Sequence, residues 1–199
     1  MEKDAVRGWQ SFNFSNAARS LRRQALVVYP TDTVFGLGCH PLSGSAVARL
    51  CALKGRLVTK GLVLVAPSYR LLEDYVDFPA AEWPKQIKNS WPGAVTWVVP
   101  AKSQVPDYLT GGRRTIAVRL CLHPVVKGLC YHLKSSLVST SANPSGRPPA
   151  RNLFVARRYF GAAVDCYLNG ALDQNAMASE IREFPSGKVL RSQPRREPS

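Results

Sequence analysis

The segment over residues 137–149, LVSTSANPSGRPP, constrains the fold more than any other stretch of the chain. It opens with the apolar pair Leu137 and Val138 and continues into hydroxyl and amide side chains, which predicts the end of a buried strand. Pro144 cannot donate to a strand ladder and Gly146 favours a turn, so the strand cannot continue past them. In open α/β sheets, ligands bind where strands leave the core in this way. The alternative is a turn whose polar side chains satisfy only its own backbone.

An earlier segment repeats this arrangement of a buried strand followed by side-chain oxygens. Residues 25–29, ALVVY, form a continuous apolar run that predicts a strand buried on both faces. Pro30 ends the run, and Thr31, Asp32 and Thr33 follow directly. Residues 34–38, VFGLG, are apolar with two glycines, so the backbone there can approach another group closely. The repetition favours a ligand site built from the ends of two strands.

Three cations form a second group of candidate site residues. A helix capped by Ser43 or Ser45 is predicted to carry an apolar stripe at i, i+3 and i+4, formed by Val47, Leu50 and Cys51. Lys54 continues this stripe, so its ammonium should face a specific partner, and Arg56 and Lys60 follow before a strand predicted over 61–66. The alternative is a basic C-terminal cap whose lysine stem reaches water. Because methionine keeps the apolar stem, Lys54→Met is expected to leave the fold intact.

The remaining pattern predicts one domain over residues 1–199. Further strands are expected at 94–100, 115–120, 164–168, 178–183 and 188–191, and further helices at 15–24, 69–76, 80–89, 124–133 and 152–160. In the strand 115–120, Thr115 and Arg119 share one face, opposite an apolar face. We expect a loop over 106–114, a loosely held lead-in over 1–14 and a disordered basic tail over 192–199.

The composition restricts the class of partner and the compartment. The 199 residues include 27 Lys and Arg against 13 Asp and Glu, and this net charge of +14 attracts polyanions such as nucleotides and RNA. Five scattered cysteines without a C-x-x-C pair predict small buried apolar residues in a reducing compartment, with neither a zinc site nor a disulfide framework. No segment has the pattern of a signal peptide or a membrane span, so we expect a cytoplasmic protein that does not use a membrane.

Taken together, three motifs resemble those of the YrdC-type (TsaC-type) threonylcarbamoyl-AMP synthases, in their short single-domain bacterial form. The motifs are residues 29–38 (YPTDTVFGLG), residues 54–56 (KGR) and residues 139–143 (STSAN). The similarity runs from about Leu21 to Arg191 and includes residues 91–93 (WPG), 117–119 (AVR), 123–124 (HP) and 179–182 (SEIR). It implies an α/β fold, with a twisted mixed sheet and flanking helices around a large positively charged cavity.

The resemblance also implies a reaction and roles for the motif residues. L-threonine, bicarbonate or CO2, and ATP would give L-threonylcarbamoyladenylate and pyrophosphate, with Mg2+ accompanying ATP. Lys54 and Arg56 would act in catalysis by neutralising charge on the triphosphate. The residues expected at ATP are Arg56, Lys60, Thr115, Ser141, Asn143, Arg151 and Arg191. Those expected at threonine are Thr31, Thr33, Arg119, Ser139 and Ser179, with Arg119 pairing the carboxylate. No protein metal site is predicted, and Asp32 is the single candidate metal ligand.

Three features depart from the longer relatives. Val65 and Ala66 stand where those relatives carry a histidine, Arg151 stands where they have a threonine near the nucleotide, and their second domain has no counterpart here. The missing histidine means that one threonine contact must differ.

Partners and alternatives also follow from the resemblance. The product would serve N6-threonylcarbamoyladenosine (t6A) modification of tRNA at position 37, through a transfer complex of the TsaB, TsaD and TsaE type, with tRNA itself a possible partner. One alternative is a non-catalytic RNA-binding module of the same fold, although aromatic residues are not interleaved with the basic ones as stacking would require. Another is a carbamoyl-transfer enzyme, although such enzymes are usually fused to zinc-finger segments whose cysteines do not occur here.

Overall fold

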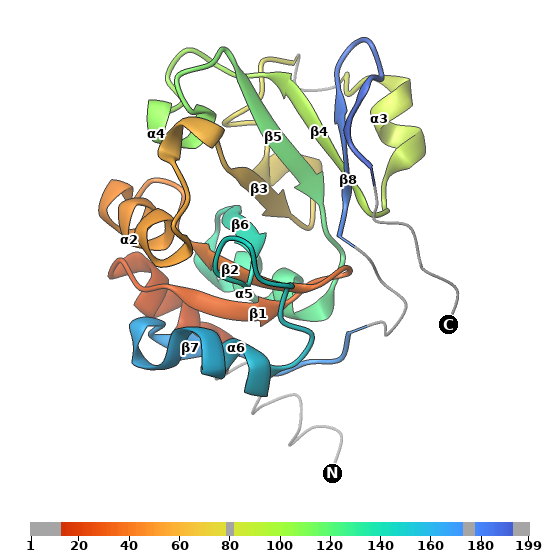
Figure 1. The fold of residues 1–199 in the computed structure, drawn as a ribbon. Helices are drawn as coiled ribbons and strands as arrows, with labels where there is room; N and C mark the ends of the chain where they lie inside the picture. Colours follow the sequence, from red (N-terminus) through yellow and green to blue (C-terminus); the bar gives the residue numbers. More distant parts are fainter. Residues whose placement is uncertain (1–12, 79–81, 173–177, 193–199) are drawn as a thin grey trace.

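In the computed structural model, residues 13–78, 82–172 and 178–192 are described. Within them, nine strands form one mixed sheet in the order β7-β1-β2-β6-β3-β5-β4-β8-β9. The strands are β1 (Val27–Pro30), β2 (Phe35–Cys39), β3 (Val63–Ala66), β4 (Val95–Pro100), β5 (Thr115–Leu120), β6 (Leu137–Ser141), β7 (Cys166–Tyr167), β8 (Glu180–Glu183) and β9 (Val189–Arg191). The pairs β1–β7, β3–β5 and β4–β8 are parallel and the other pairs are antiparallel. The predicted twisted mixed sheet with flanking helices is confirmed (Figure 1).

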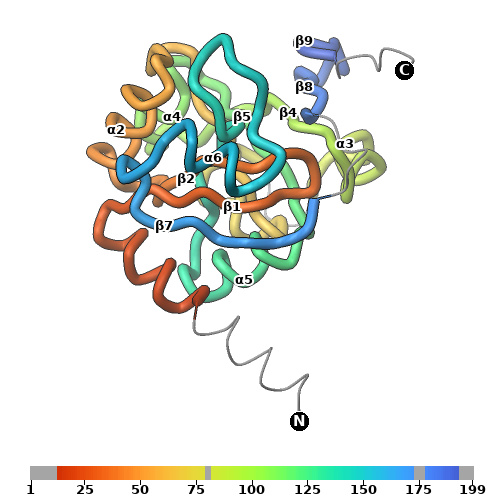
Figure 2. The backbone as a smooth tube through the Cα atoms, turned by 60° about the horizontal axis from the view of Figure 1, so that its bottom comes forward, coloured from red at the N-terminus to blue at the C-terminus, as the bar shows by residue number. Residues whose placement is uncertain are grey.

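Helices and short turns of helix flank the sheet. The structure has α2 (Gly44–Lys54), α3 (Lys85–Ser90), α4 (Asp107–Thr110), α5 (Pro124–Leu133), α6 (Leu153–Phe160) and the 3-10 turns η1 (Val58–Lys60), η2 (Tyr69–Leu71) and η3 (Gly161–Ala163). Residues 13–22 are also helical. Figures 1 and 2 show β8 and β9 at one end of the sheet, near α3, and β7 and α6 beside β1 at the other end. Among the described helices, none is both long and apolar enough to cross a membrane.

The two faces of the sheet are filled differently. On one face, Val28, Leu37, Leu64 and Val118 belong to the larger hydrophobic cluster, which also takes in side chains of α2, α3 and α6. On the opposite face, Val27, Tyr29, Val65 and Leu137 pack in a smaller cluster with α5 and the helical residues 13–22. Small and polar residues occupy the rest of that second face, so part of it is left open as a cavity.

Capping residues define where three of the helices begin. Ser43 accepts from the backbone of Ala46 to begin α2, and Gly55 ends it in the left-handed conformation with φ 59°. Asn152 caps α6 through its contact with the Val155 amide. The helix predicted over residues 124–133 is confirmed as α5, with the His123 side chain as its cap. Local sequence therefore fixes where these helices begin and end.

The N-terminal prediction was wrong at its boundary. The lead-in was expected to reach Phe14 and the helix to start at Ser15 and run to Gln24, but residues 13–15 are already helical and the helix ends at residue 22. Phe14 packs against α5, because a Cβ added to Gly128 would lie 2.3 Å from its ring. Gln24 leaves the helix with φ 67°. The rest of the predicted lead-in and most of the predicted tail lie outside the described residues.

Other differences concern short elements. The predicted loop 106–114 contains α4, the predicted helix 69–76 is only the turn η2, and the helix predicted over 80–89 is α3. The segment with two glycines, residues 34–38, contains most of the strand β2. Each of these short elements is held by tertiary contacts that outweigh weak local propensity.

The burial predicted for the cysteines is confirmed for all but Cys166, which is partly exposed. All five are free, and four of them are buried. Burial raises the pKa of the Cys39 thiol to about 12, so this thiol stays protonated.

Candidate active site

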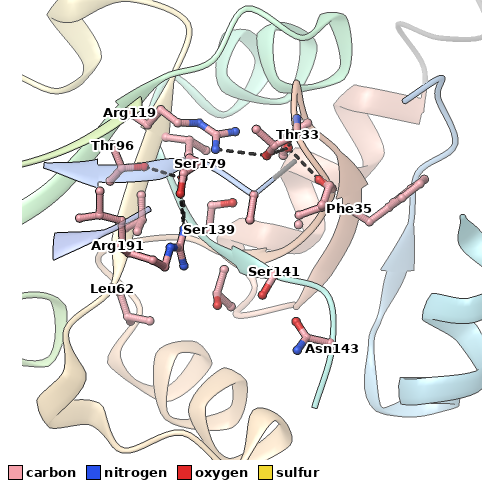
Figure 3. A pocket seen from close by; sticks show the side chains of 18 of the residues that line it. Thr33, Phe35, Leu62, Thr96, Arg119, Ser139, Ser141, Asn143, Ser179 and Arg191 are labelled. Atoms are coloured by element: carbon pink, nitrogen blue, oxygen red, sulfur yellow. Dashed lines mark hydrogen bonds between the residues drawn. The ribbon is translucent and has the colours of Figure 1, made fainter. Parts of the chain in front are cut away.

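A cavity of about 230 Å3 lies on the open part of the second sheet face. Its lining comes from the ends of several strands, from the C-terminus of α2 and from the segments next to β8 and β9. Figure 3 shows Arg119 and Thr33 on one side of the cavity, Asn143 on the other, and Ser139 and Ser141 between them. The volume is below the range of roughly 300–1,000 Å3 that is usual for drug-sized ligands, so a nucleotide would extend beyond this enclosed part.

The cavity gathers most of the predicted site residues. Those that line it are Thr31, Thr33, Lys54, Arg56, Arg119, Ser139, Ser141, Asn143, Ser179 and Arg191. Three predicted ATP contacts, Lys60, Thr115 and Arg151, are not among the lining residues. Lys60 is exposed in η1, Thr115 lies four residues before Arg119 at the far end of β5, and Arg151 is exposed in the loop before α6.

One wall of the cavity, which we call the α2–β6 wall, consists of Lys54, Arg56, Ser141 and Asn143. Lys54 is only 5% exposed. Its Nζ donates to the carbonyl of Ser141 at 2.5 Å, to the carbonyl of Asn143 at 2.6 Å and to Asn143 Oδ1 at 3.4 Å. An ammonium has three hydrogens, so these contacts use all of them. The expectation that Lys54 faces a specific partner is confirmed, and that partner is the end of β6.

Burial changes the acid–base properties of this wall. Desolvation, with a smaller contribution from Arg56, lowers the pKa of Lys54 to about 8. Desolvation also lowers the pKa of Arg56. Arg56 Nη2 donates to the carbonyls of Gly61 at 2.8 Å and Lys60 at 3.4 Å, which ties the end of α2 to the start of the β3 segment. Its Nε is buried without a partner among the described residues.

The opposite wall, the β5 wall, consists of Arg119, Thr31 and Thr33, with Asp32 paired to Arg119 outside the lining. Arg119 Nη2 forms an ion pair with Asp32, and its Nη1 donates to Thr33 Oγ1 at 3.2 Å. Cys121 Sγ donates to the same Asp32 oxygen at 3.2 Å. The Arg119 side chain is 7% exposed, and its Nε has no partner among the described residues. Asp32 thus holds the guanidinium of Arg119 in place, while other N–H groups of the same guanidinium remain without a partner.

The hydroxyls of this wall form a relay with one possible direction. Thr31 Oγ1 donates to the carbonyl of Val34 at 2.7 Å, so the 3.0 Å contact between the two threonine hydroxyls must be donated by Thr33. Thr31 also accepts from the Thr33 amide at 3.1 Å, which fills its hydrogen-bonding capacity. Thr33 accepts from Arg119 and retains one lone pair. Thr33 can therefore only accept from a ligand, whereas Thr31 acts through Thr33.

The C-terminal strands bring a third group to the cavity. Arg191, on β9, donates through Nη2 to the Ser179 carbonyl at 2.7 Å and to Ser179 Oγ at 3.3 Å. Ser179 Oγ also bonds Thr96 Oγ1, on β4, at 2.9 Å (Figure 3). The sequence prediction missed Thr96, because its burial and its contact with Ser179 arise only in the folded chain.

The charge of the lining favours an anionic ligand. Four cations line the cavity, and no carboxylate is among its described lining residues. Burial lowers the pKa of Arg191, and the nearby Arg119 and Arg56 lower it further, because these guanidinium groups repel one another. Bound phosphate or carboxylate groups would relieve that repulsion.

The described residues offer little to a protein-bound metal ion. They contain no group of three or more His, Cys, Asp or Glu side chains that could hold one. Asp32, the candidate ligand, already pairs with Arg119.

The sequence prediction also missed the apolar and small residues of the lining. These include Leu62, Val63, Ala178 and Ile181, together with the polar Thr140 and Ser145. Residues 34–36, which also line the cavity, belong to the segment in which the sequence predicts a close backbone approach, and Val65 is a position at which it predicts a changed threonine contact. Val65 lies on β3 opposite Arg119 on β5, so the position that departs from the longer relatives faces the β5 wall. Apolar positions of this kind have no local signal that distinguishes them from core.

The cavity can now be compared with those of known proteins. The model of the Sua5/YciO/YrdC family, described as "Telomere recombination", matches residues 19–192. The threonylcarbamoyl-AMP synthase of Halorhodospira halophila is 47% identical over 184 residues, covering 92% of this chain and 96% of that protein. That of Cellvibrio japonicus is 42% identical over 175 residues, covering 88% and 93%.

A solved structure agrees with these matches. The crystal structure of P. abyssi Sua5 complexed with L-threonine superposes with a TM-score of 0.84 and 29% identity, covering 92% of this chain and 54% of that one. The present chain thus spans about half the length of that Sua5 protein. With the motifs, the sheet and the family model in agreement over nearly its whole length, the chain belongs to the Sua5/YciO/YrdC family.

Proposed function

We propose that this protein is a threonylcarbamoyl-AMP synthase, which makes L-threonylcarbamoyladenylate and pyrophosphate from L-threonine, bicarbonate or CO2, and ATP. The observation that carries this proposal is the convergence of both cationic walls on one cavity, in a chain 42–47% identical to proteins of that name. The reaction joins an amino acid, a one-carbon unit and a nucleotide, and therefore needs an anion-binding cavity with two distinct sides.

On the β5 wall, threonine binds with its carboxylate on the unused donors of Arg119. Such a contact is charge-assisted, and the fork of the guanidinium fixes the orientation of the carboxylate. Thr33 has a lone pair and no hydrogen to give, so it accepts from the amine or the β-hydroxyl of the amino acid. The P. abyssi Sua5 structure with L-threonine supports an amino-acid site in this fold.

On the α2–β6 wall, the triphosphate of ATP binds near Arg56, with Arg191 close by. Lys54 contributes its positive charge and holds the turn that presents Ser141 and Asn143. Lys60, Thr115 and Arg151 would contact the nucleotide only outside the enclosed cavity, where the adenosine part of ATP must lie if it binds here.

The chemistry requires no protein nucleophile. The threonine nitrogen attacks the carbon of CO2, loses a proton and becomes a carbamate. A carbamate oxygen then attacks the α-phosphorus, and the bond to the departing pyrophosphate breaks. Catalysis consists of placing the three substrates and neutralising the charge that develops on the phosphates.

Mg2+ would enter this reaction with ATP and not from a protein site. The described lining has hydroxyl, amide and cationic groups but no carboxylate, which does not suit a resident Mg2+. Phosphate oxygens and water would supply its ligands, so we assign no protein residue to it.

The product would serve t6A formation on tRNA. We place the protein in the cytoplasm, upstream of a transfer complex of the TsaB, TsaD and TsaE type that consumes the adenylate. The net charge of +14 is compatible with direct tRNA contact. The non-catalytic RNA-binding alternative has no observation in its favour beyond that charge.

The test is pyrophosphate release from ATP, with the adenylate product identified by mass spectrometry. We expect release that depends on L-threonine and on bicarbonate, and that falls to background when either is omitted. Release that is independent of threonine would point to hydrolysis of ATP to AMP and pyrophosphate, and would contradict the proposal. Absence of release, with tight binding of RNA, would favour the RNA-binding module.

A further inference from the structure

Tyr29 carries a buried hydroxyl whose position next to the cavity is not explained by packing. The side chain is fully buried in the smaller hydrophobic cluster, at its boundary with the cavity. Its Oη has no hydrogen-bond partner among the described residues. A phenylalanine would fill the same space without an unsatisfied polar atom, so a hydroxyl here calls for a functional reason.

Two glycines of β2 determine where this hydroxyl lies. Tyr29 on β1 pairs with Gly36, and a Cβ added to Gly38 would lie 2.9 Å from Tyr29 Cε1 and 3.1 Å from its Oη. A Cβ at Gly36 would lie 3.3 Å from Tyr29 Cζ and 3.1 Å from Ser139 Oγ. The tyrosine ring therefore lies across the bare surface of β2 and reaches toward β6, where Ser139 is its neighbour.

Ser139 has a hydroxyl that the protein itself leaves unused. Ser139 lines the cavity and is 8% exposed, and its hydroxyl has no hydrogen-bond partner among the described residues. Burial raises the pKa of Tyr29, and the adjacent Ser139 hydroxyl opposes that rise. The phenol consequently stays protonated and has a hydrogen to give.

We propose that Tyr29 is a positioning residue that sets the direction of the Ser139 hydroxyl. When substrate binds, Tyr29 Oη, which has no partner among the described residues, donates to Ser139 Oγ. The hydrogen of Ser139 then points into the cavity, toward an oxygen of the bound amino acid or of its carbamate. This inference rests on the proposed function. A serine hydroxyl can otherwise rotate to present either its hydrogen or a lone pair.

The consequence is a cavity that distinguishes donors from acceptors. Ser139 presents a hydrogen, whereas Thr33, whose hydrogen is given to Thr31, presents a lone pair. An amino acid with acceptor oxygens at one end and donor groups at the other then fits in one orientation. That orientation directs the nitrogen to the place where the carbamate must form.

The test uses Tyr29→Phe, which removes only the hydroxyl. We expect the KM for L-threonine to rise about five- to ten-fold, the KM for ATP to stay at the parent value, and the melting temperature to equal or exceed that of the parent. In a Ser139→Ala background, Tyr29→Phe should have no further effect on the threonine KM, because its partner is gone. Tyr75→Phe is the matched control, since Tyr75 is buried in the larger cluster and does not line the cavity.

The outcomes separate this inference from the function on which it rests. A parent protein that neither binds threonine in calorimetry nor releases pyrophosphate would overturn the proposed function and the inference with it. A parent that does both, together with an unchanged threonine KM in Tyr29→Phe, would overturn the inference alone. A lower melting temperature, with an equal kinetic effect in the Ser139→Ala background, would assign Tyr29 a structural role and also overturn it.

Discussion

The α2–β6 wall holds its cations through backbone carbonyls, whereas the β5 wall holds its cation through side chains. Lys54 donates to carbonyls at the end of β6 and just after it, and Arg56 donates to a carbonyl shortly before β3. Arg119 donates instead to the side chains of Asp32 and Thr33. The cations of the α2–β6 wall therefore fix the backbone conformation around them. Arg119 of the β5 wall is instead held in place by neighbouring side chains.

This difference predicts two kinds of mutational response. Removing a cation that binds buried carbonyls leaves them without a donor, so stability and activity should fall together. Removing a cation that is oriented by side chains should mainly disturb the ligand that it binds. The predictions that follow test this contrast, beginning with the largest effect.

Lys54→Met should slow pyrophosphate release roughly 10²–10³-fold, since it removes a cation beside the triphosphate. It should also lower the free energy of unfolding by about 1.5–3 kcal/mol, because the Ser141 and Asn143 carbonyls lose a charged donor. The second part reverses the expectation from sequence that methionine is tolerated here. Thermal melting and single-turnover kinetics measure the two effects.

Lys127→Met, on the exposed side of α5, is the control for Lys54→Met and should match the parent in both measurements. A Lys54→Met protein that melts like the parent but is inactive would restrict Lys54 to the phosphates and break the contrast between the walls. An active Lys54→Met protein would remove Lys54 from the mechanism.

Arg119→Ala should raise the KM for L-threonine roughly 10–100-fold, the loss expected for a charge-assisted contact to a carboxylate. The KM for ATP should change little. Arg49→Ala, which breaks an exposed ion pair with Asp165, is the control and should leave both constants unchanged. Steady-state kinetics, with each substrate varied in turn, measure both KM values. A larger rise in the KM for ATP than in the KM for threonine would contradict the assignment of Arg119 to threonine.

Thr33→Val should raise the threonine KM by about five-fold, the effect of one neutral hydrogen bond. Valine keeps the shape of threonine but removes the acceptor that Arg119 orients. Thr33→Ser keeps the hydroxyl and should remain close to the parent. Equal defects in the two variants would indicate that the methyl group matters and that the hydroxyl relay does not.

The low pKa of Lys54 predicts a change of stability with pH. The pKa is lowered from 10.5 to about 8 on folding, so between these two values the unfolded chain binds a proton that the folded protein has released. The free energy of unfolding of the parent should therefore rise relative to that of Lys54→Met as the pH increases from about 8 to 10.5. Paired melts across this range measure the difference, in which other titrating groups cancel. A difference that decreases would place the Lys54 pKa above its usual value.

The sequence predicted the parts of the site that carry a local signal. The apolar stripe of α2 placed Lys54 on its buried side, and alternation in β5 placed Arg119 opposite the apolar face. Residues whose function depends on distant partners were missed. Thr96 has a role only because the segment that enters β8 brings Ser179 beside it. By contrast, the close approach predicted at residues 34–38 is confirmed at Gly36, where an added Cβ would lie 3.1 Å from Ser139 Oγ.

For the fold, too, the sequence located the elements with a local signal and not those placed by distant partners. Helices with clear caps, such as α6 after Asn152, could be located from sequence within a residue or two. The strand β2 could not, because two of its five residues are glycines with little strand propensity, and its place depends on pairing with β1 and β6. Similarly, Lys60 and Thr115 resembled family positions in sequence but do not reach the enclosed cavity.

The most direct test of the contrast is calorimetric binding of L-threonine, without ATP, to the parent and to two variants. The account predicts that Arg119→Ala binds threonine at least about ten-fold more weakly than the parent, and that Arg56→Ala binds it as tightly as the parent does. Loss of threonine affinity in Arg56→Ala equal to that in Arg119→Ala would show that the two walls do not serve different substrates.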